Sequence, residues 1–217
     1  MNTTRWTLIA EMVLALAVTG CVQTYVNLDY VPATGSIQNG APTFQVGEFL
    51  DLRATPPPLP YKVSLTKGGF FGPNWETLGP KYLGMVSFEP VDGQTLPDYV
   101  FLNDSASNVV SRTVASALEA RGMLAPASVR HVIVGEILEL SVDTLTHQHA
   151  VATLRVSVKS AAGQLLYRKV YTASRQSLDH YPQAGDPVVS LRKLAGHALQ
   201  DAIDHALDDP EMRRVIR

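Results

Sequence analysis

The sequence has little cysteine, little charge and few aromatic side chains. It contains one cysteine in 217 residues, which excludes an internal disulfide framework and a zinc site built from several thiolates. Lys and Arg number 18 and Asp and Glu number 20, so the formal net charge is -2. Nucleic-acid binding needs clustered positive charge, and we therefore expect no nucleic-acid partner. With 46 % apolar residues, the chain can build one sizeable core.

Long apolar runs are also missing, with one short exception near the N-terminus. Residues 6–18 are largely apolar and follow Arg5, although Glu11 interrupts the run. This run is shorter than the roughly 20 residues that a helix needs to cross a bilayer. A positive residue followed by a short apolar run is typical of a secretory signal peptide. We therefore expect residues 1–20 to be a signal peptide.

The only cysteine lies directly after this run, in the sequence Val18-Thr19-Gly20-Cys21. An aliphatic residue, two small residues and a cysteine resemble the lipobox of bacterial lipoproteins, in which the thiol accepts diacylglycerol. Each buried methylene of an acyl chain contributes about 0.8 kcal/mol, so two or more chains would hold the protein at a membrane. The alternative is an ordinary signal peptide, or a buried helix, with a cysteine there by chance.

The residue after the cysteine indicates which membrane is involved. It is Val22 and not aspartate. By resemblance to the sorting signals of enterobacterial lipoproteins, this residue implies the outer membrane. We therefore expect a lipid anchor at Cys21 on the periplasmic side of the outer membrane.

Hydrophobic periodicity predicts an α/β fold of the α+β type. Alternating or continuous apolar runs predict strands over 44–53, 61–66, 82–86, 129–142, 152–159 and 165–173. Apolar stripes predict helices from a cap at Asp104 or Ser105 to Arg121, from a cap at Asp186 to Ala206, and from Asp209 to Ile216. This order predicts a two-layer sandwich, with two main helices on one face of a mixed, mostly antiparallel sheet. The expected organisation is a signal peptide over 1–20, a lipidated tether over 21–42 with a short strand at 26–31, and a periplasmic α/β domain over 43–217.

Four features, taken in order along the chain, resemble one known family. They are the lipobox Cys21, a first strand ending in Asp51-Leu52-Arg53, a helix ending in Ala117-Leu118-Glu119-Ala120-Arg121-Gly122, and the tail over 208–216. In this order they resemble the YajG-type outer-membrane lipoproteins of proteobacteria. The resemblance implies an outer-membrane location and a small α/β fold, and it implies no defined activity and no cofactor. The proline-rich segment 56–60 and the irregular stretch 68–100 depart from the pattern, which leaves a different partner open.

Two groups of residues are candidates for partner binding. Asp51 and Arg53 lie two apart on a strand, so their side chains point the same way and can form an ion pair or contact a partner at the strand end. Phe70, Phe71 and Trp75 concentrate aromatic side chains in a loop-rich region and would form an apolar patch if they are exposed. The alternatives are an ion pair that orients a loop and a small cluster that holds a long loop down.

No catalytic constellation stands out. His147 and His149 could share one strand face, but no third ligand completes a metal site. Glu136 and Glu139 differ by an odd number and are expected to face opposite ways on one strand, which argues against a pair of catalytic carboxylates. On the last long helix, His197 and His205 each lie four residues from Asp201 and are expected to pair with it. We therefore expect no enzyme, no metal and no cofactor.

These observations favour a non-enzymatic envelope lipoprotein that is tethered by Cys21 and acts through contacts with another envelope protein. The alternative function is that of an auxiliary lipoprotein of an ABC-type lipid or solute transport system. An apolar groove large enough for acyl chains would favour the alternative.

Overall fold

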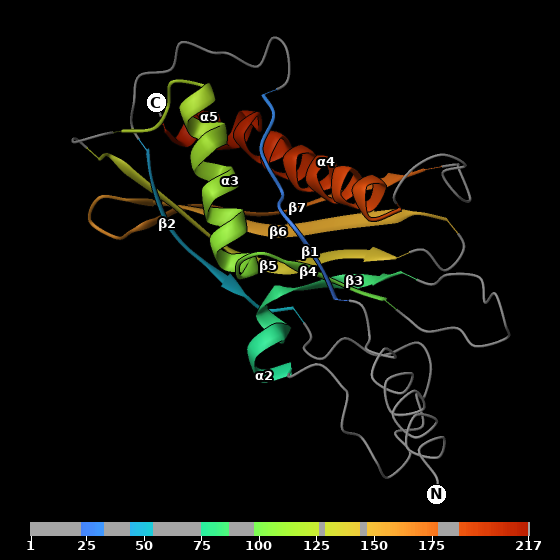
Figure 1. Cartoon of the computed structure of the whole chain (residues 1–217). Helices are drawn as coiled ribbons and strands as arrows, with labels where there is room; N and C mark the ends of the chain where they lie inside the picture. Colours follow the sequence, from blue (N-terminus) through green and yellow to red (C-terminus); the bar gives the residue numbers. More distant parts are fainter. Residues whose placement is uncertain are drawn as a thin grey trace, which may run out of the picture.

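Among the described residues, seven strands form one mixed sheet in the computed structural model of the chain, and two long helices lie across one face of that sheet (Figure 1). The structure describes residues 23–32, 44–53, 75–86, 98–125, 129–143, 147–177 and 187–216. The strands are β1 (Gln23–Val26), β2 (Phe44–Asp51), β3 (Tyr82–Val86), β4 (Asp98–Leu102), β5 (His131–Asp143), β6 (His149–Ser160) and β7 (Leu165–Gln176). The helices are α2 (Trp75–Leu78), the 3-10 helix η1 (Gly79–Lys81), α3 (Ala106–Ala120), α4 (Pro187–Leu207) and α5 (Pro210–Val215).

The strands lie in the order β1-β4-β3-β5-β6-β7, and β2 pairs with β5 outside this path. The pairs β3–β4, β5–β6 and β6–β7 are antiparallel, whereas β1–β4, β2–β5 and β3–β5 are parallel. The longest ladders are the antiparallel ones that join β5, β6 and β7, so the sheet is mostly antiparallel. The predicted two-layer α+β sandwich is confirmed.

The hydrophobic core lies between the sheet and the two long helices. Ile133 and Leu154 from the sheet are fully buried, and so are Leu118 of α3 and Leu199 of α4. Burying one such side chain contributes about 1.5–3 kcal/mol. The apolar stripes that predicted α3 and α4 are the surfaces that face the sheet, so both predictions are confirmed.

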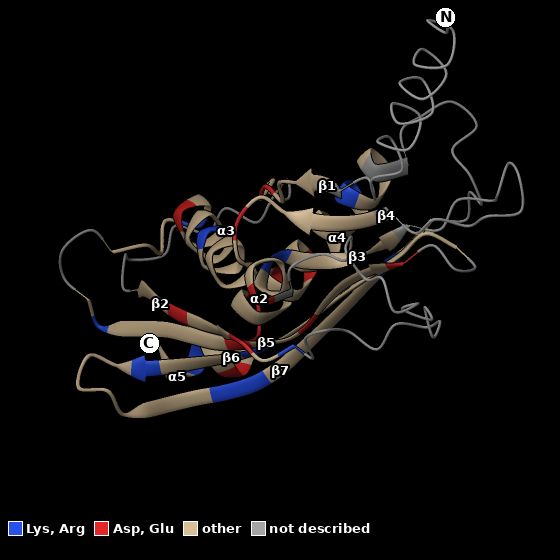
Figure 2. Ribbon diagram, turned by 60° about the horizontal axis from the view of Figure 1, so that its bottom comes forward, with Lys and Arg blue, Asp and Glu red and all other residues tan. Residues whose placement is uncertain are grey.

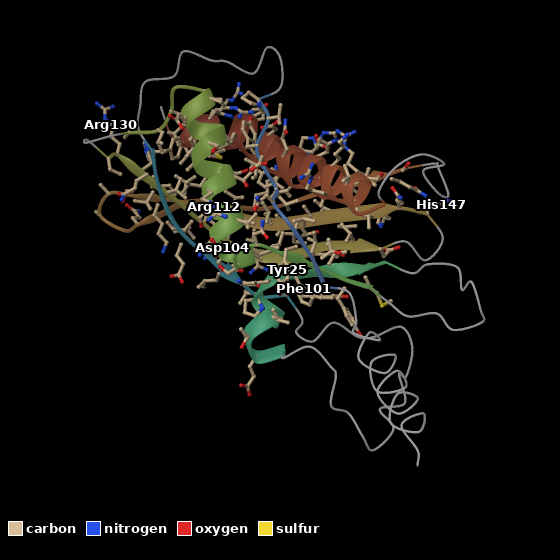
Figure 3. The ribbon with its side chains drawn as sticks, viewed as in Figure 1. Tyr25, Phe101, Asp104, Arg112, Arg130 and His147 are labelled. Atoms are coloured by element: carbon tan, nitrogen blue, oxygen red, sulfur yellow. The ribbon has the colours of Figure 1, made fainter. Side chains whose placement is uncertain are left out.

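The ends of α3 are set by residues that the sequence already indicates. The Ser105 hydroxyl accepts a hydrogen bond from the backbone N–H of Asn108 at 3.2 Å, which caps the first turn. The neighbouring Asp104 accepts a hydrogen bond from Arg112 Nη1 at 2.6 Å (Figure 3). After the helix, Gly122 has a φ of 66°, a conformation that favours glycine and ends the helix.

The N-terminal part of the sheet differs from the prediction. The first strand spans Gln23–Val26 and not 26–31. Hydrophobic periodicity does not predict α2, which lies in the stretch expected to be irregular, or β4, which begins in that stretch and ends two residues beyond it. The consecutive β4 residues from Tyr99 to Leu102 are all buried, so the strand shows no apolar–polar alternation. The predicted strand over 61–66 lies outside the described residues.

A bulge in β5 overturns the prediction about its two glutamates. The pairing of β5 with β6 shifts between Ile137 and Glu139. Buried positions are therefore odd-numbered before the bulge and even-numbered after it. Glu136 and Glu139 consequently lie on the same face, the one opposite the helices, and the expectation that they face opposite ways is wrong. Glu136 forms an ion pair with Arg155 on this face, and Glu139 accepts a hydrogen bond from Ser141.

Candidate functional site

Several of the predicted site residues fall where the structure gives no placement. Cys21, Phe70 and Phe71 lie outside the described residues. Trp75 is the first residue of α2, and its side chain also lies outside the described part. The structure therefore places Asp51 and Arg53 among the predicted partner-binding residues.

Arg53 binds its neighbour Asp51 and three backbone carbonyl groups. Its Nε donates to Asp51 Oδ1 and its Nη2 to Asp51 Oδ2, both at 2.8 Å. Its Nη1 donates to the carbonyl oxygens of Tyr82 at 2.7 Å and Leu140 at 3.1 Å. Its Nη2 also donates to the carbonyl oxygen of Pro80 at 3.1 Å. An arginine side chain has five N–H donors, and these bonds use all of them.

These bonds lie where one edge of β5 changes its neighbour. β2 pairs with this edge as far as Ile137, and β3 pairs with it from Val142 onward. Between these two points on β5, the Arg53 guanidinium donates to the carbonyl oxygen of Leu140, and it also donates to that of Tyr82 at the start of β3. A buried carbonyl without a donor costs free energy, so this ion pair joins β2, β3 and β5. With its donors used inside the chain, Arg53 has a structural role, and a partner contact through it stays a prediction.

A second polar cluster fixes the segment that follows Cys21. β1 pairs with β4 in parallel, with Gln23 opposite Tyr99 and Val26 opposite Leu102. Directly after β4, the backbone N–H of Asn103 donates to the carbonyl of Val26, and its side chain donates to Asn27 Oδ1 at 2.7 Å. Residues 23–32 of the predicted tether therefore lie against the domain.

Tyr30 connects this segment to both long helices. Its hydroxyl accepts a hydrogen bond from Arg121 Nη1 at 2.8 Å and donates to Asp204 Oδ1 at 3.0 Å. Arg121 Nη2 also bonds Asp204 Oδ1 at 2.8 Å and lies 3.6 Å from Asp208 Oδ2. The Arg121 side chain is 1 % exposed, so this is a buried ion pair that links the end of α3 to α4. Removing one partner of such a pair leaves an uncompensated charge.

The electrostatics of the cluster favour the charged arginine. Burial acts to lower the pKa of Arg121, but its bonds to Asp204 and Tyr30 outweigh that effect and raise the pKa above the ordinary value. For Tyr30, burial raises the pKa, and the bond from Arg121 opposes the rise. The cluster therefore keeps the Arg121 guanidinium charged and the Tyr30 hydroxyl protonated at neutral pH.

Aromatic side chains gather at β1, β3 and β4. Tyr25 and Phe101 lie on adjacent strands with ring centroids 5.8 Å apart (Figure 3). Phe101 also meets Tyr82 at 5.9 Å and Tyr99 at 6.4 Å. Burial, with a smaller effect of Tyr99, raises the pKa of Tyr82 to about 12. The Tyr25 side chain is 46 % exposed, so this cluster reaches the surface beside the segment that follows Cys21.

His149, one of the two histidines considered as metal ligands, lies beside an aspartate and a buried glutamine. His149 Nδ1 lies 3.6 Å from Asp143 Oδ2, and the intervening Gln148 is buried and accepts a hydrogen bond from Ser190 of α4. In the part of the chain that the structure describes, no group of three or more His, Cys, Asp or Glu side chains is arranged to hold a metal ion.

On α4, the expected pairing of Asp201 with His197 and His205 gives way to another bond. Asp201 accepts a hydrogen bond from Arg175 Nε at 2.5 Å, which joins the helix to β7. None of the helices among the described residues has both the length and the apolar character needed to cross a membrane.

A third polar cluster holds the C-terminal helix on β7. Asp209 caps α5 and accepts hydrogen bonds from Glu211 N at 2.7 Å, Lys169 Nζ at 2.9 Å and the Tyr171 hydroxyl at 2.8 Å. Burial acts to raise the pKa of Asp209, but the bonds from Lys169 and Tyr171 outweigh it and hold the pKa below the ordinary value. Burial and the bond with Tyr167 raise the pKa of Tyr171.

Sequence reasoning missed Tyr30 and Arg121 as a connected pair. One signal could have found Arg121, because it continues the buried stripe of α3 four residues after Ala117 and seven after Val114. A charged residue on a buried stripe needs a buried partner. Nothing in the local sequence identifies that partner as Tyr30 or Asp204.

Comparison with solved structures identifies proteins of the same fold. A Xanthomonas campestris protein from the family described as DUF330 matches with a TM-score of 0.51 and 11 % identity, covering 86 % of this chain and 92 % of that one. A protein described as uncharacterized matches with a TM-score of 0.50 and 10 % identity, covering 89 % of this chain and 99 % of that one. At such low identity these matches establish a shared fold and nothing more.

A minor lipoprotein from Acinetobacter baumannii matches 51 % of this chain and 89 % of its own length, with 16 % identity and a TM-score of 0.36. No family model matches the sequence, and no curated protein matches it.

Proposed function

We propose that this chain is a lipoprotein of the bacterial cell envelope that acts through protein contacts and not as an enzyme. The observation that carries the proposal is the position of Cys21, which ends a lipobox and is separated from β1 by Val22 alone. Because β1 is paired into the sheet and Tyr30 is bonded to both long helices, a lipid on Cys21 would hold the domain close to the membrane surface.

The polar clusters of the domain support a binding role over a catalytic one. The donors of Arg53 are used by Asp51 and backbone carbonyls, Arg121 is enclosed with Asp204, and Asp209 caps a helix. Each of these clusters joins elements of the fold. A partner would then bind the outside of a rigid domain, as expected for a protein that acts by contact.

The location and family belong to the same proposal. Val22 after the cysteine supports sorting to the outer membrane, with the domain on the periplasmic side. The order of features that resembles the YajG-type lipoproteins supports the same place. The partner would be another protein of the envelope.

The test is fractionation of cells that produce the full chain, with mass spectrometry of its N-terminal peptide. We expect Cys21 to carry lipid and the protein to appear in the outer-membrane fraction. Cys21→Ala should leave the domain folded and move it out of the membrane fraction. Val22→Asp is the matched control, because it keeps the cysteine and should shift the protein to the inner membrane. An unmodified, uncleaved N-terminus would contradict the anchor.

A pull-down from envelope extracts, with Cys21→Ala in parallel, tests the contact role. Recovery of one envelope protein with the lipidated chain supports the proposal. Recovery of transporter subunits together with phospholipid would favour the alternative role as an auxiliary lipoprotein of an ABC-type system.

A further inference from the structure

The sheet has a second face that carries a patterned surface. α3 and α4 pack on one face, and the other face of β2, β5, β6 and β7 carries the side chains that alternate with the core. Acidic residues occur on β2 and basic residues on β7 (Figure 2), and of the basic residues Arg168 lies on the outer face, whereas Lys169 and Arg175 bond the helices on the other face. Leu50 of β2 and Val170 of β7 are 47 % and 45 % exposed on this outer face.

These two apolar side chains belong to one row across the sheet. The register places Leu50 opposite Glu136, Glu136 opposite Arg155, and Arg155 opposite Val170. Glu136 and Arg155 form an ion pair in the middle of the row. From β2 to β7, the four side chains of this row are therefore apolar, acidic, basic and apolar.

The neighbouring row has the same polarity. Val134 lies opposite Ser157, and Ser157 lies opposite Arg168, whose Nε donates to the serine hydroxyl at 3.2 Å. On β2, a bulge places Gly47 and Glu48 opposite Val134, and Glu48 is exposed. An acidic residue thus stands at the β2 end of this row and a basic residue at the β7 end.

We propose that this outer face binds a second copy of the chain, related by a two-fold axis that runs parallel to the strands between β5 and β6. Such an axis reverses each row. It places Leu50 against the partner's Val170, Glu136 against the partner's Arg155, and Glu48 against the partner's Arg168. The two faces would pack as an aligned sandwich about 10 Å apart, a distance that long side chains span.

The charge pattern favours a second copy of the chain as the partner that binds this face. A two-fold interface must be complementary to itself, because the same surface is used on both sides. Here the acidic half of each row meets the basic half of the other copy, and the exposed apolar ends meet each other. Reversing one sign would bring like charges together, which costs affinity. This proposal does not depend on the lipid anchor.

One pair of residues makes the proposal testable. Glu48 and Arg168 lie on β2 and β7, which are three strand spacings, or about 14 Å, apart within one chain. Within one copy no ion pair joins these two residues, and the Arg168 guanidinium is bonded to Ser157 on the neighbouring strand. Any coupling between them therefore reports a contact between copies.

The experiment measures the mass of the full chain in detergent by light scattering, with the detergent contribution subtracted. We expect a dimer for the wild type and about tenfold or more weaker dimerisation for Arg168→Glu, because the substitution sets Glu48 against a second carboxylate. The double variant Glu48→Arg with Arg168→Glu should restore the dimer. Glu119→Arg, an exposed charge reversal on α3, is the control and should leave the mass unchanged.

Val170→Asp provides a second route if Arg168→Glu fails to fold, and it should also give a folded monomer. A monomeric wild type would overturn the proposal, and it would do so even if another protein binds this face. A dimer that neither Arg168→Glu nor Val170→Asp weakens would place the interface elsewhere. Failure of the folded double variant to dimerise would show that Glu48 and Arg168 do not meet across the axis.

Discussion

The two ends of the sheet are built in different ways. The meander formed by β5, β6 and β7 consists of long antiparallel strands in chain order, joined to α4 by apolar contacts. The N-terminal edge consists of the short strands β1, β4 and β3, and β1 reaches its place by parallel pairing with a strand far along the chain. Polar bonds that involve Asn27, Tyr30 and Arg53 hold this edge.

Different interactions therefore stabilise the domain and position its N-terminal segment. In the meander, neighbouring strands are joined by short connections, and burial of apolar side chains supplies the free energy. At the edge, short strands bury little surface of their own, so a few side-chain bonds decide where the segment after Cys21 lies. We expect damage to the meander to unfold the domain and damage to the edge to release one segment.

Leu199→Asp should have the largest effect on the free energy of unfolding, because it disrupts the core between α4 and the meander. Leu199 is fully buried between α4 and the sheet, and a carboxylate there would have no partner. We expect a loss of about 4 kcal/mol or more, which would unfold a marginally stable domain. Thermal melting by circular dichroism measures the loss, and Val189→Asp, at an exposed position of the same helix, is the control. A cooperative melt with an unaltered midpoint would show that this face of α4 is not in the core.

Arg121→Met should release the segment bonded at the N-terminal edge and leave the meander folded. The substitution leaves the partly buried Asp204 without its cation and Tyr30 without its donor. We expect a loss of about 1–3 kcal/mol, smaller than that for Leu199→Asp because release of one segment lets water reach Asp204. Hydrogen exchange should increase most in β1 and at residues 27–32, with smaller changes in β6 and β7. Equal increases in all strands would mean that the Arg121 cluster stabilises the whole domain and not the N-terminal edge in particular.

Adding one methyl group compares the two regions at a smaller scale. A Cβ at Gly84 of β3 would lie 2.0 Å from the carbonyl oxygen of Val142, so Gly84→Ala should destabilise the domain by about 1–3 kcal/mol. A Cβ at Gly196 of α4 meets nothing within 4 Å, and Gly196→Ala should stabilise it by about 0.5–1 kcal/mol. Chemical denaturation measures both. Equal effects would contradict the close approach of β3 to β5.

The acid limb of the stability curve tests the bond between β7 and α5. Because the folded-state pKa of Asp209 is lowered, its stabilising contribution is present at neutral pH and is lost as the pH falls below the unfolded value of about 3.9. Asp209→Asn keeps a good helix cap but removes the charge. We expect the variant to lose less stability than the wild type between about pH 4 and pH 2, by up to about 1.4 kcal/mol per pH unit. Parallel curves would show that Asp209 is not ionised in this cluster.

The elements that the sequence predicted best are those whose information is local. The alternation in β6 and the apolar stripes of α3 and α4 each depend on residues close together in the chain. β4 was missed because it is buried on both faces and therefore does not alternate. The orientation of Glu139 was missed because a bulge, which local parity does not include, moves it to the other face.

The α+β class, the two long helices and the Asp51–Arg53 pair followed from the sequence alone, because periodicity and short spacings act over a few residues. Three features depend on the tertiary structure: Arg53 joins three strands, Tyr30 bonds Arg121 and Asp204, and the outer face carries opposite charges on β2 and β7. These arrangements bring together residues that are distant in the chain, and the pairing of strands and the packing of helices, which no local pattern specifies, sets their geometry.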